Sequence, residues 1–278
     1  NVHDKCGTEI EFLPVEQWFV KILDKKTKLI SQGRKIKWHP EHMFKRYENW
    51  IKGLEWDWSI SRERHFGIPI PVWICGKCNE VVLPSEKELP IDPAAIGKRK
   101  CQKCGGTAEP EKKVLDTWAT SSLTWEIASS LVGGKIKLPY SLRPQAHDII
   151  RTWAFYTIAR ALYHEDKIPW EEIMMSGFVT LGGEKMGKSK GNSIEPQIAV
   201  EQFGADALRY WAASSRLGED LDYMEKDIIT GKKFVTKILN AANFLFINLE
   251  HQKKMPSKLV ETDRLFLSRL NEAIENCT

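Results

Sequence analysis

Two pairs of cysteines have the spacing of metal-binding knuckles. Cys75 and Cys78 form one Cys-x-x-Cys pair, and Cys101 and Cys104 form the other. Two such knuckles bring four thiolates within tetrahedral reach of one ion, which favours Zn²⁺ over two disulfides or four unlinked thiols. Because four cysteines close the coordination shell, we predict a structural zinc site with no position for a reactive water.

The segment that carries the cysteines, residues 75–110, has little apolar content and is rich in Lys, Glu, Gly and Pro. A segment of this composition cannot form a hydrophobic core of its own and needs a cross-link to fold, which the metal would provide. Nearby cations are expected to help hold the thiolates ionised. These cations are Lys77, Lys98, Arg99, Lys100 and Lys103.

A second group of residues has the composition of an anion-binding loop. Residues 182–192 contain four glycines, three lysines and Ser189. The glycines allow the backbone to approach a ligand closely, and the backbone amides and the ammonium groups of Lys185 and Lys188 suit phosphate. A solvated hairpin tip would have a similar composition, so the loop alone does not decide between the two interpretations.

The bulk properties narrow the class of protein. The 278 residues carry 41 basic and 37 acidic side chains, a net charge of +4, which is too weak a bias to indicate nucleic-acid binding by itself. No apolar run approaches the roughly 18 residues that span a bilayer, and no secretion signal is present. We therefore expect a cytoplasmic protein, and the polar start without Met suggests a chain cut from a longer one.

Hydrophobic periodicity predicts an α/β protein in which helices alternate with apolar strands. A strongly buried helix is predicted over Asp148–His164, and the strand Ile173–Val179 precedes the lysine-rich loop. The apolar pattern leaves Val15–Ile22 open between strand and helix, and the prolines make Ile68–Ile74 an extended segment. Further helices are predicted over His42–Leu54, Glu195–Phe203, Ala205–Ser215, Asp227–Leu249 and from about Asp263 onward.

The loop and the strand before it resemble a family signature. The stretch Gly177-Phe-Val-Thr-Leu-Gly-Gly-Glu-Lys-Met-Gly-Lys-Ser-Lys-Gly-Asn192 is similar to the KMSKS region of class I aminoacyl-tRNA synthetases, with Gly187 where the family usually has serine. The resemblance implies that the loop closes over the ATP phosphates. Lys188 would then neutralise the leaving pyrophosphate, with Lys185 and Ser189 assisting.

Two neighbouring stretches extend the resemblance to the nucleotide site. Gly177, Phe178 and Val179 would line the adenine, and the segment Ala146-His147-Asp148 resembles the family's Gly-x-Asp beside the ribose. His147 would contact the nucleotide, and Asp148 would accept a hydrogen bond from a ribose hydroxyl. From its position alone, Asp148 would instead cap the helix that follows, and the two roles are compatible.

The amino-acid pocket is implied by a third stretch. Leu115-Asp-Thr-Trp-Ala-Thr-Ser-Ser122 resembles the Asp-Thr-Trp-x-Ser-Ser pattern of the valine-specific branch of the family. By position, the resemblance implies that Trp118 and Trp153 form two flat walls of a pocket for a small branched side chain. Without the resemblance, both would be read as core tryptophans. Two further family-like stretches are Ser61–Gly67, expected near the adenylate or the tRNA end, and Gly204–Arg209, where Asp206 would stabilise a helix start.

The resemblance implies an architecture with five segments. The fold would be the second half of a Rossmann-like parallel-sheet catalytic domain with a zinc-knuckle insertion and a C-terminal α-helical segment. The expected segments are 1–74, catalytic core after an editing insertion; 75–110, zinc insertion; 111–192, Rossmann-like half with the KMSKS-like loop; 193–226, helical stem-contact region; and 227–278, start of an anticodon-binding bundle.

The implied reaction is the activation of valine by Mg²⁺-ATP and its transfer to tRNA. No His-x-Gly-His signature occurs in the chain. We therefore expect an N-terminal half of the same enzyme as partner, an exposed apolar sheet edge and little activity in the isolated chain. The alternatives are an isoleucyl or leucyl enzyme, or a zinc-ribbon nucleic-acid module without chemistry.

Overall fold

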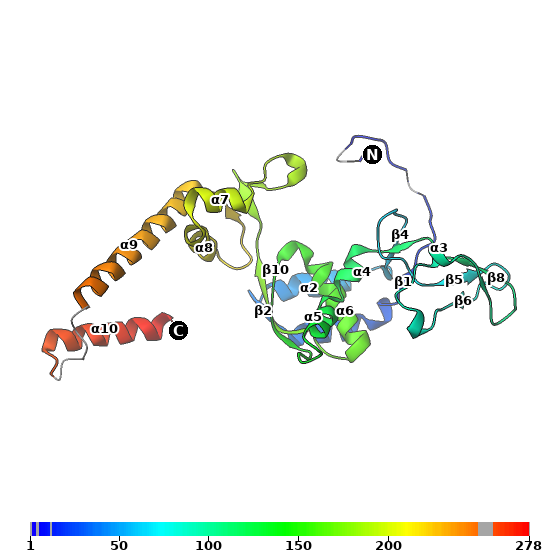
Figure 1. Cartoon of the computed structure of the whole chain (residues 1–278), viewed down its shortest axis with the longest axis horizontal. Coiled ribbons are helices and arrows are strands. Elements are labelled where there is room, and N and C mark those ends of the chain that lie inside the picture. The colour runs from blue at the N-terminus through cyan, green and yellow to red at the C-terminus, as the bar shows by residue number, and fades with distance from the viewer. Residues whose placement is uncertain (1, 4–5, 12, 250–257, 278) are drawn as a thin grey trace. The chain divides into compact units, whose positions relative to one another are not determined.

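The computed structural model describes residues 2–3, 6–11, 13–249 and 258–277, without the side chain of Ser189. By the contacts between its residues, the chain of Figure 1 divides into two compact units. The first unit comprises residues 1–193 and 215–223, and the second comprises residues 194–214 and 224–278. Within the described ranges, no helix has both the length and the apolar character needed to cross a membrane.

A parallel sheet of three strands forms the centre of the first unit. The strand order is β10 (Tyr140–Ala146), β11 (Trp170–Ser176) and β2 (Lys37–His39). Parallel neighbours require a crossover connection, and here helix α6 (Trp153–Glu165) joins β10 to β11. The register pairs Ala146 with Ser176, so both strands end at the same edge of the sheet.

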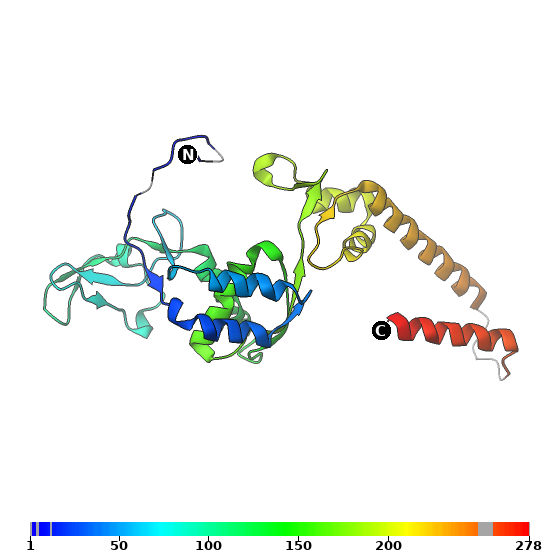
Figure 2. The same cartoon turned by 180° about the vertical axis from the view of Figure 1, so that it is seen from behind.

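Two short helices complete the core beside α6. Figure 2 shows α1 (Lys26–Lys35) and α2 (Met43–Lys52) side by side, in front of the green helices of this unit. Tyr47 is fully buried between them and donates a hydrogen bond to the Leu29 carbonyl at 2.9 Å. A Cβ on Gly33 would lie 2.2 Å from the Tyr47 ring, so only glycine allows this packing. The other large buried side chains of this core include Ile51, Phe155, Ile158, Ile173 and Met175.

Residues 73–110 form a small antiparallel lobe. Its strand order is β6 (Val81–Val82), β5 (Trp73–Cys75), β8 (Thr107–Pro110) and β7 (Arg99–Lys100). The lobe also holds η2 (Glu86–Glu88) and α3 (Pro93–Ile96). Its buried cluster consists of Trp73, Ala108 and two cysteines. A core this small agrees with the prediction that the lobe needs a cross-link.

Short elements connect this lobe to the parallel sheet. Strand β1 (Phe19–Val20) pairs with β3 (Trp58–Ser59), and β4 (Ser61–Arg62) pairs with β9 (Val114–Leu115). The helices η1 (Leu23–Lys25), α4 (Thr117–Ser121), α5 (Thr124–Leu131) and η3 (His147–Ile150) complete the unit.

The lysine-rich loop lies on a small sheet of its own. Strand β12 (Val179–Leu181) pairs antiparallel with β13 (Glu184–Lys185) and parallel with β14 (Leu221–Asp222). The helix η4 (Lys188–Lys190) follows β13. The predicted loop therefore begins as a hairpin, because Gly182 and Gly183 supply the positive φ angles of 61° and 81° that its turn needs.

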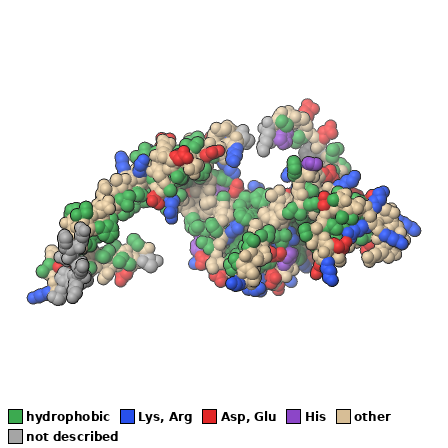
Figure 3. Space-filling view, in the orientation of Figure 1, with side chains coloured by type: hydrophobic (Ala, Val, Ile, Leu, Met, Phe, Trp, Pro, Cys, Tyr) green, Lys and Arg blue, Asp and Glu red, His purple; other side chains and the backbone are tan. Residues whose placement is uncertain are grey.

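In the described residues of the second unit, the regular elements are all helices. It contains α7 (Pro196–Phe203), α8 (Ala205–Ala213), α9 (Glu225–Leu249) and α10 (Glu261–Cys277). A Cβ on Gly231 would lie 2.9 Å from the Ala207 carbonyl, so glycine permits the close approach of α8 and α9. Hydrophobic side chains are exposed along the far part of α9 (Figure 3), including Phe244, Leu245 and Ile247.

The predicted elements are largely present, with one instructive error. The helices expected over 42–54, 195–203, 205–215 and 227–249 are α2, α7, α8 and α9, with Asp206 in the first turn of α8. The single helix predicted over 148–164 is wrong, because Thr152 has φ −113° and ψ −89° and separates η3 from α6. Asp148 therefore does not cap α6, whose first residue is Trp153.

Candidate functional site

The carboxyl edge of the parallel sheet gathers four of the predicted nucleotide-binding residues. His147 and Asp148 follow β10, while Gly177 and Phe178 follow β11. The His147 ring meets the Phe178 ring edge-on, with centroids 4.6 Å apart. In open α/β sheets, ligands bind in the crevice outside the carboxyl ends of the strands, so this is the expected position for a nucleotide.

Asp220 contacts both the segment after β10 and the segment after β11. No sequence pattern predicted it as a site residue. Its Oδ1 accepts a hydrogen bond from the Phe178 backbone N–H at 2.7 Å and lies 3.5 Å from His147 Nε2. The Phe178 N–H, followed by the contact with His147, holds the pKa of Asp220 below its ordinary value. The carboxylate thus fixes the backbone of Phe178 and the ring of His147 together.

Gly177 is required by packing. A Cβ at this position would lie 2.0 Å from the Glu219 carbonyl oxygen and 2.6 Å from the Asp220 nitrogen. Both atoms belong to the backbone and cannot move aside cheaply. The glycine therefore lets the segment before β14 cross directly over the end of β11.

Lys185 reaches across to Asp148. Its Nζ lies 3.2 Å from Asp148 Oδ2 and 3.6 Å from the centroid of the Phe178 ring. The ammonium group is therefore held both by a carboxylate and by the face of an aromatic ring. The hairpin carries this predicted catalytic lysine to the predicted ribose-binding residue.

Asp222 organises the hairpin and was also missed from the sequence. Its Oδ1 accepts hydrogen bonds from Thr180 Oγ1 at 2.7 Å and from the Gly183 N–H at 3.1 Å. These bonds hold the pKa of Asp222 below its ordinary value. A single carboxylate from β14 thus ties β12 and the turn of the hairpin in place.

Lys188 is exposed on η4, and no described carboxylate lies within ion-pair distance of it. Lys190, by contrast, lies 3.9 Å from Glu184. Gly187 has an extended backbone with φ −158°, which any residue adopts, and its N–H donates to Asn192 Oδ1 at 2.8 Å. The site leaves one loop cation available for an anionic ligand. The side chain of Ser189 lies outside the described atoms.

The elements that carry the two predicted pocket tryptophans are packed together. The Asp116 carboxylate caps α4 by accepting from the Trp118 N–H at 3.0 Å. Trp153 Nε1, at the start of α6, donates to the Ser121 carbonyl at the end of α4 at 3.1 Å. The aromatic contacts of the described residues do not include a direct pairing of the two indoles. Instead, the Arg143 guanidinium lies 3.1 Å from the centroid of the Trp153 ring.

The family-like stretch 61–67 contacts this region through Arg62. The Arg62 guanidinium lies 3.3 Å from Asp116 Oδ1, the same carboxylate that caps α4. Arg160 of α6 donates to the Ala119 carbonyl at 3.1 Å. Two arginines therefore hold α4, and with it Trp118, against the core.

The four knuckle cysteines converge, with all Sγ atoms within 4.8 Å of one another. No disulfide joins any of the cysteines in the described ranges. The knuckles are alike: the N–H of Asn79 and that of Gly105 each donate, at 2.9 Å, to the carbonyl of the first cysteine. Both residues have the positive φ that this turn needs. A tetrahedral Zn²⁺ with Zn–S bonds of about 2.3 Å requires sulfurs roughly 3.8 Å apart, so the donor set fits zinc.

The Cys75 thiolate is favoured mainly by backbone amides. The N–H groups of Cys78 and Lys77 lower the pKa of Cys75 to about 6. The nearby cations predicted for this role mostly pair with carboxylates: Lys98 with Glu109, Arg99 with Glu88, and Lys103 with Glu80. That the five nearby cations help hold the thiolates ionised stays a prediction, and three of them, Lys98, Arg99 and Lys103, are partly neutralised by these acidic neighbours.

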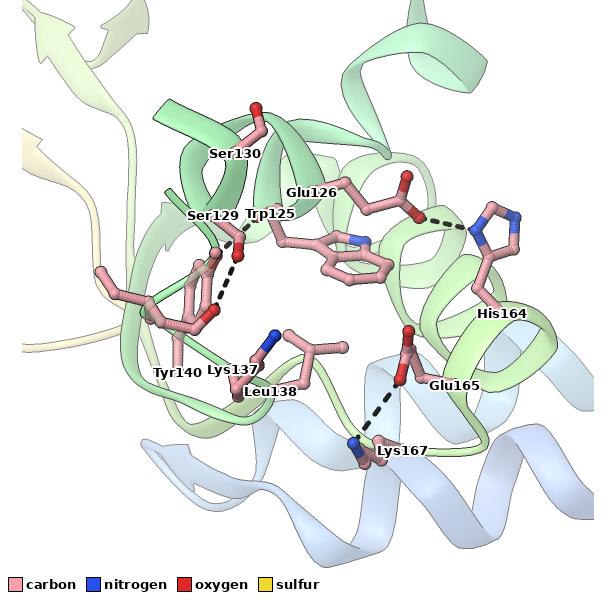
Figure 4. A pocket seen from close by; sticks show the side chains of 12 residues that line it. Trp125, Glu126, Ser129, Ser130, Lys137, Leu138, Tyr140, His164, Glu165 and Lys167 are labelled. Carbon is pink, nitrogen blue, oxygen red and sulfur yellow. Dashed lines mark hydrogen bonds and ion pairs between the residues drawn. The ribbon is translucent and has the colours of Figure 1, made fainter. Parts of the chain in front are cut away.

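A separate hollow of about 590 Å³ lies at the other end of β10, beside Tyr140. Figure 4 shows Trp125, Glu126 and His164 around it, with His164 Nδ1 2.6 Å from Glu126 Oε1. Because β10 runs from Tyr140 to Ala146, this hollow is remote from the carboxyl edge that holds His147 and Asp148. It belongs to the amino end of the strand and is not part of the candidate site.

The family described as tRNA synthetases class I (I, L, M and V) matches residues 5–224. The chain belongs to this family. Its curated relatives include valine–tRNA ligases of Picrophilus torridus, 42% identical over 100% of this chain and 37% of that protein, and of Thermoplasma acidophilum, 50% identical over 89% and 32%. The chain thus spans about a third of the length of these relatives.

A solved structure supports the fold independently. Methionyl-tRNA synthetase of Mycobacterium tuberculosis, in complex with methionyl-adenylate, matches with a TM-score of 0.70. The match covers 99% of this chain and 50% of that protein, at 19% sequence identity. At this identity the likeness concerns the mixed α/β fold alone.

Proposed function

We propose that this chain is part of the catalytic region of a valine–tRNA ligase. The whole enzyme would join valine to ATP as valyl-adenylate, release pyrophosphate, and pass valine to the 3′ end of its tRNA. The identities to valine–tRNA ligases, 50% and 42%, favour valine over the isoleucyl and leucyl alternatives. The observation that carries the proposal is the meeting of Asp148, Phe178 and Lys185 at the carboxyl edge of a parallel sheet.

The nucleoside of ATP would lie against this edge. Asp148 would accept from a ribose hydroxyl, His147 would contact the nucleotide, and Gly177, Phe178 and Val179 would line the adenine. Because Lys185 now contacts both Asp148 and Phe178, it would be displaced toward the phosphates when the nucleoside enters. The ion pair is partly exposed, with 53% of the Lys185 and 36% of the Asp148 side chain accessible, so exchanging it for a ligand costs little.

The phosphates would lie under the hairpin and η4. Lys188 would stabilise the charge that develops on pyrophosphate as the valine carboxylate attacks the α-phosphorus, with Lys185 and Ser189 assisting. Its exposed ammonium has no described acidic partner to neutralise it. Mg²⁺ would be held mainly through the phosphate oxygens, as is usual for this ion.

Trp118 and Trp153 would bound the valine side chain. The hydrogen bond from Trp153 Nε1 to the Ser121 carbonyl supports this, since it joins the elements that carry the two indoles. A rigid apolar slot selects among aliphatic side chains by volume.

The remaining assignments follow the same family. The sheet β10-β11-β2 would be the second half of a Rossmann-like domain. A structural Zn²⁺ would be held by Cys75, Cys78, Cys101 and Cys104 within the lobe 75–110. Its coordination bonds would cross-link the two knuckles. Residues 1–74 and 111–192 would belong to the catalytic core. Residues 193–226 would contact the tRNA stem, and residues 227–278 would begin an anticodon-binding bundle.

The proposal is tested by amino-acid-dependent ATP–pyrophosphate exchange with the full-length protein. We expect exchange with valine and a loss of about 10²–10³ in kcat for Lys188→Ala. The matched control is Lys190→Ala, two residues away on the same helix, which should keep most of the activity. Exchange that prefers isoleucine or leucine would assign another branch of the family. Unchanged activity in Lys188→Ala would favour the zinc-ribbon alternative.

A further inference from the structure

Arg143 lies in the middle of β10 and has an unusual environment. Its guanidinium carbon lies 3.1 Å from the centroid of the Trp153 ring and 5.3 Å from that of Trp170. Its Nε and Nη2 atoms are buried without a hydrogen-bond partner among the described residues. A half-buried cation is therefore held between two indoles instead of against a carboxylate.

Arg99 of the lobe that contains the four cysteines differs in this respect. Arg99 also stacks on a tryptophan, Trp73, at 3.9 Å, but it forms an ion pair with Glu88 at 2.5 Å. Burial lowers the pKa of Arg143 to about 10, which leaves the group charged at neutral pH. Burying hydrogen-bond donors without partners costs free energy, so the cation–π contact with the Trp153 ring must offset part of this cost.

The contact fixes the plane of Trp153. One face of the indole is covered by Arg143, and its Nε1–H edge is anchored on the Ser121 carbonyl at 3.1 Å. With one face and one edge held, the orientation of the ring is restrained, and in the proposed pocket its opposite face would meet the valine side chain. A planar guanidinium stacks flat on an indole, whereas the compact ammonium of lysine does not.

We propose that Arg143 is a positioning residue that holds Trp153 at the width needed to accept valine and reject larger side chains. This inference rests on the proposed function. Arg143 lies behind the indole and touches no substrate atom. Its effect is therefore on selectivity among amino acids, through the orientation of Trp153.

The test is the ratio of kcat/KM for valine to kcat/KM for isoleucine in ATP–pyrophosphate exchange by the full-length enzyme. We expect Arg143→Lys and Arg143→Met each to lower this ratio by about tenfold, because a mobile indole admits the extra methylene. The KM for ATP should stay unchanged. The matched control, Arg99→Lys, removes the same kind of stack in the metal lobe and should leave the ratio unchanged.

A general loss of stability would lower both rates but not their ratio, so the ratio separates positioning from folding. Should one variant fold poorly, the other, of similar side-chain length, provides the measurement. If the ratio is unchanged in both Arg143 variants but changes in Trp153→Ala, the proposed role of Arg143 is overturned and the proposed pocket is not. An unchanged ratio in Trp153→Ala overturns the proposed pocket itself.

Discussion

The ammonium group of Lys185 lies 3.2 Å from the Asp148 carboxylate and 3.6 Å above the Phe178 ring. The lysine of the hairpin thus occupies the contacts that a ribose and an adenine would make in the proposed site. If the proposed site is right, nucleotide binding and release of Lys185 would be one event, which would deliver the lysine to the phosphates when the nucleoside arrives.

Replacing Asp148 should weaken ATP binding more than it weakens the fold. Asp148→Asn in the full-length enzyme is expected to raise the KM for ATP by about tenfold, since hydrogen bonds to charged groups contribute about 1.5–3 kcal/mol. The melting temperature should hardly change, because its ion pair with Lys185 is partly exposed and such pairs contribute little. Glu165→Gln, at an exposed pair with Lys167, is the control. An unchanged KM would remove Asp148 from the nucleotide site.

Adding a methyl group at Gly177 should be destabilising. The new Cβ would lie 2.0 Å from the Glu219 carbonyl, and overpacking of this kind costs about 1–3 kcal/mol. Gly177→Ala is measured by urea unfolding of the full-length enzyme. Gly53→Ala is the matched control, because its nearest neighbour would be 3.4 Å away and its φ is −80°. Equal midpoints for the two variants would contradict the close approach.

The metal lobe should depend on its four thiolates. Cys101→Ser is expected to abolish the binding of one equivalent of zinc and to expose the amides of residues 75–110 to hydrogen exchange, because the lobe has only a small core. Cys277→Ser, at an exposed cysteine of α10, should retain the metal. Full zinc content in Cys101→Ser, measured by elemental analysis, would disprove the site.

The hairpin should loosen in acid. The pKa of Asp222 is depressed in the folded state by its bonds to Thr180 and Gly183. Its contribution is therefore complete above the ordinary pKa of about 3.9 and is lost as the pH falls through the lower folded value. Hydrogen exchange of residues 179–185, referenced to an unfolded peptide at each pH, should show this loss. Asp222→Asn should be loose already at neutral pH, and an unaltered hairpin in this variant would refute the role.

Residues 1–278 expressed alone should show no valine-dependent pyrophosphate exchange above background. The chain carries the lysine loop but no His-x-Gly-His signature. Its strand β10 pairs only with β11 among the described residues, so one edge of the sheet is open. Adding the rest of the enzyme as a separate chain is the informative companion measurement. A rate near that of the full-length protein would refute this expectation.

The sequence by itself determined the features that depend on local chemistry. The two Cys-x-x-Cys knuckles and the Gly/Lys loop were recognisable because their spacing lies within a few neighbouring residues. The helices α2, α7, α8 and α9 followed from periodicity, since an amphipathic stripe is a property of a single segment.

Only the tertiary structure decided the contacts between different segments of the chain. Asp220 and Asp222 reach residues 178–183, and Arg143 meets Trp153 across a strand-to-helix connection. The helix break at Thr152 is likewise invisible to periodicity, because both flanks are apolar. The physical reason is that one residue type can serve many roles, and the partner that selects among them is brought near only by the packing of the sheet.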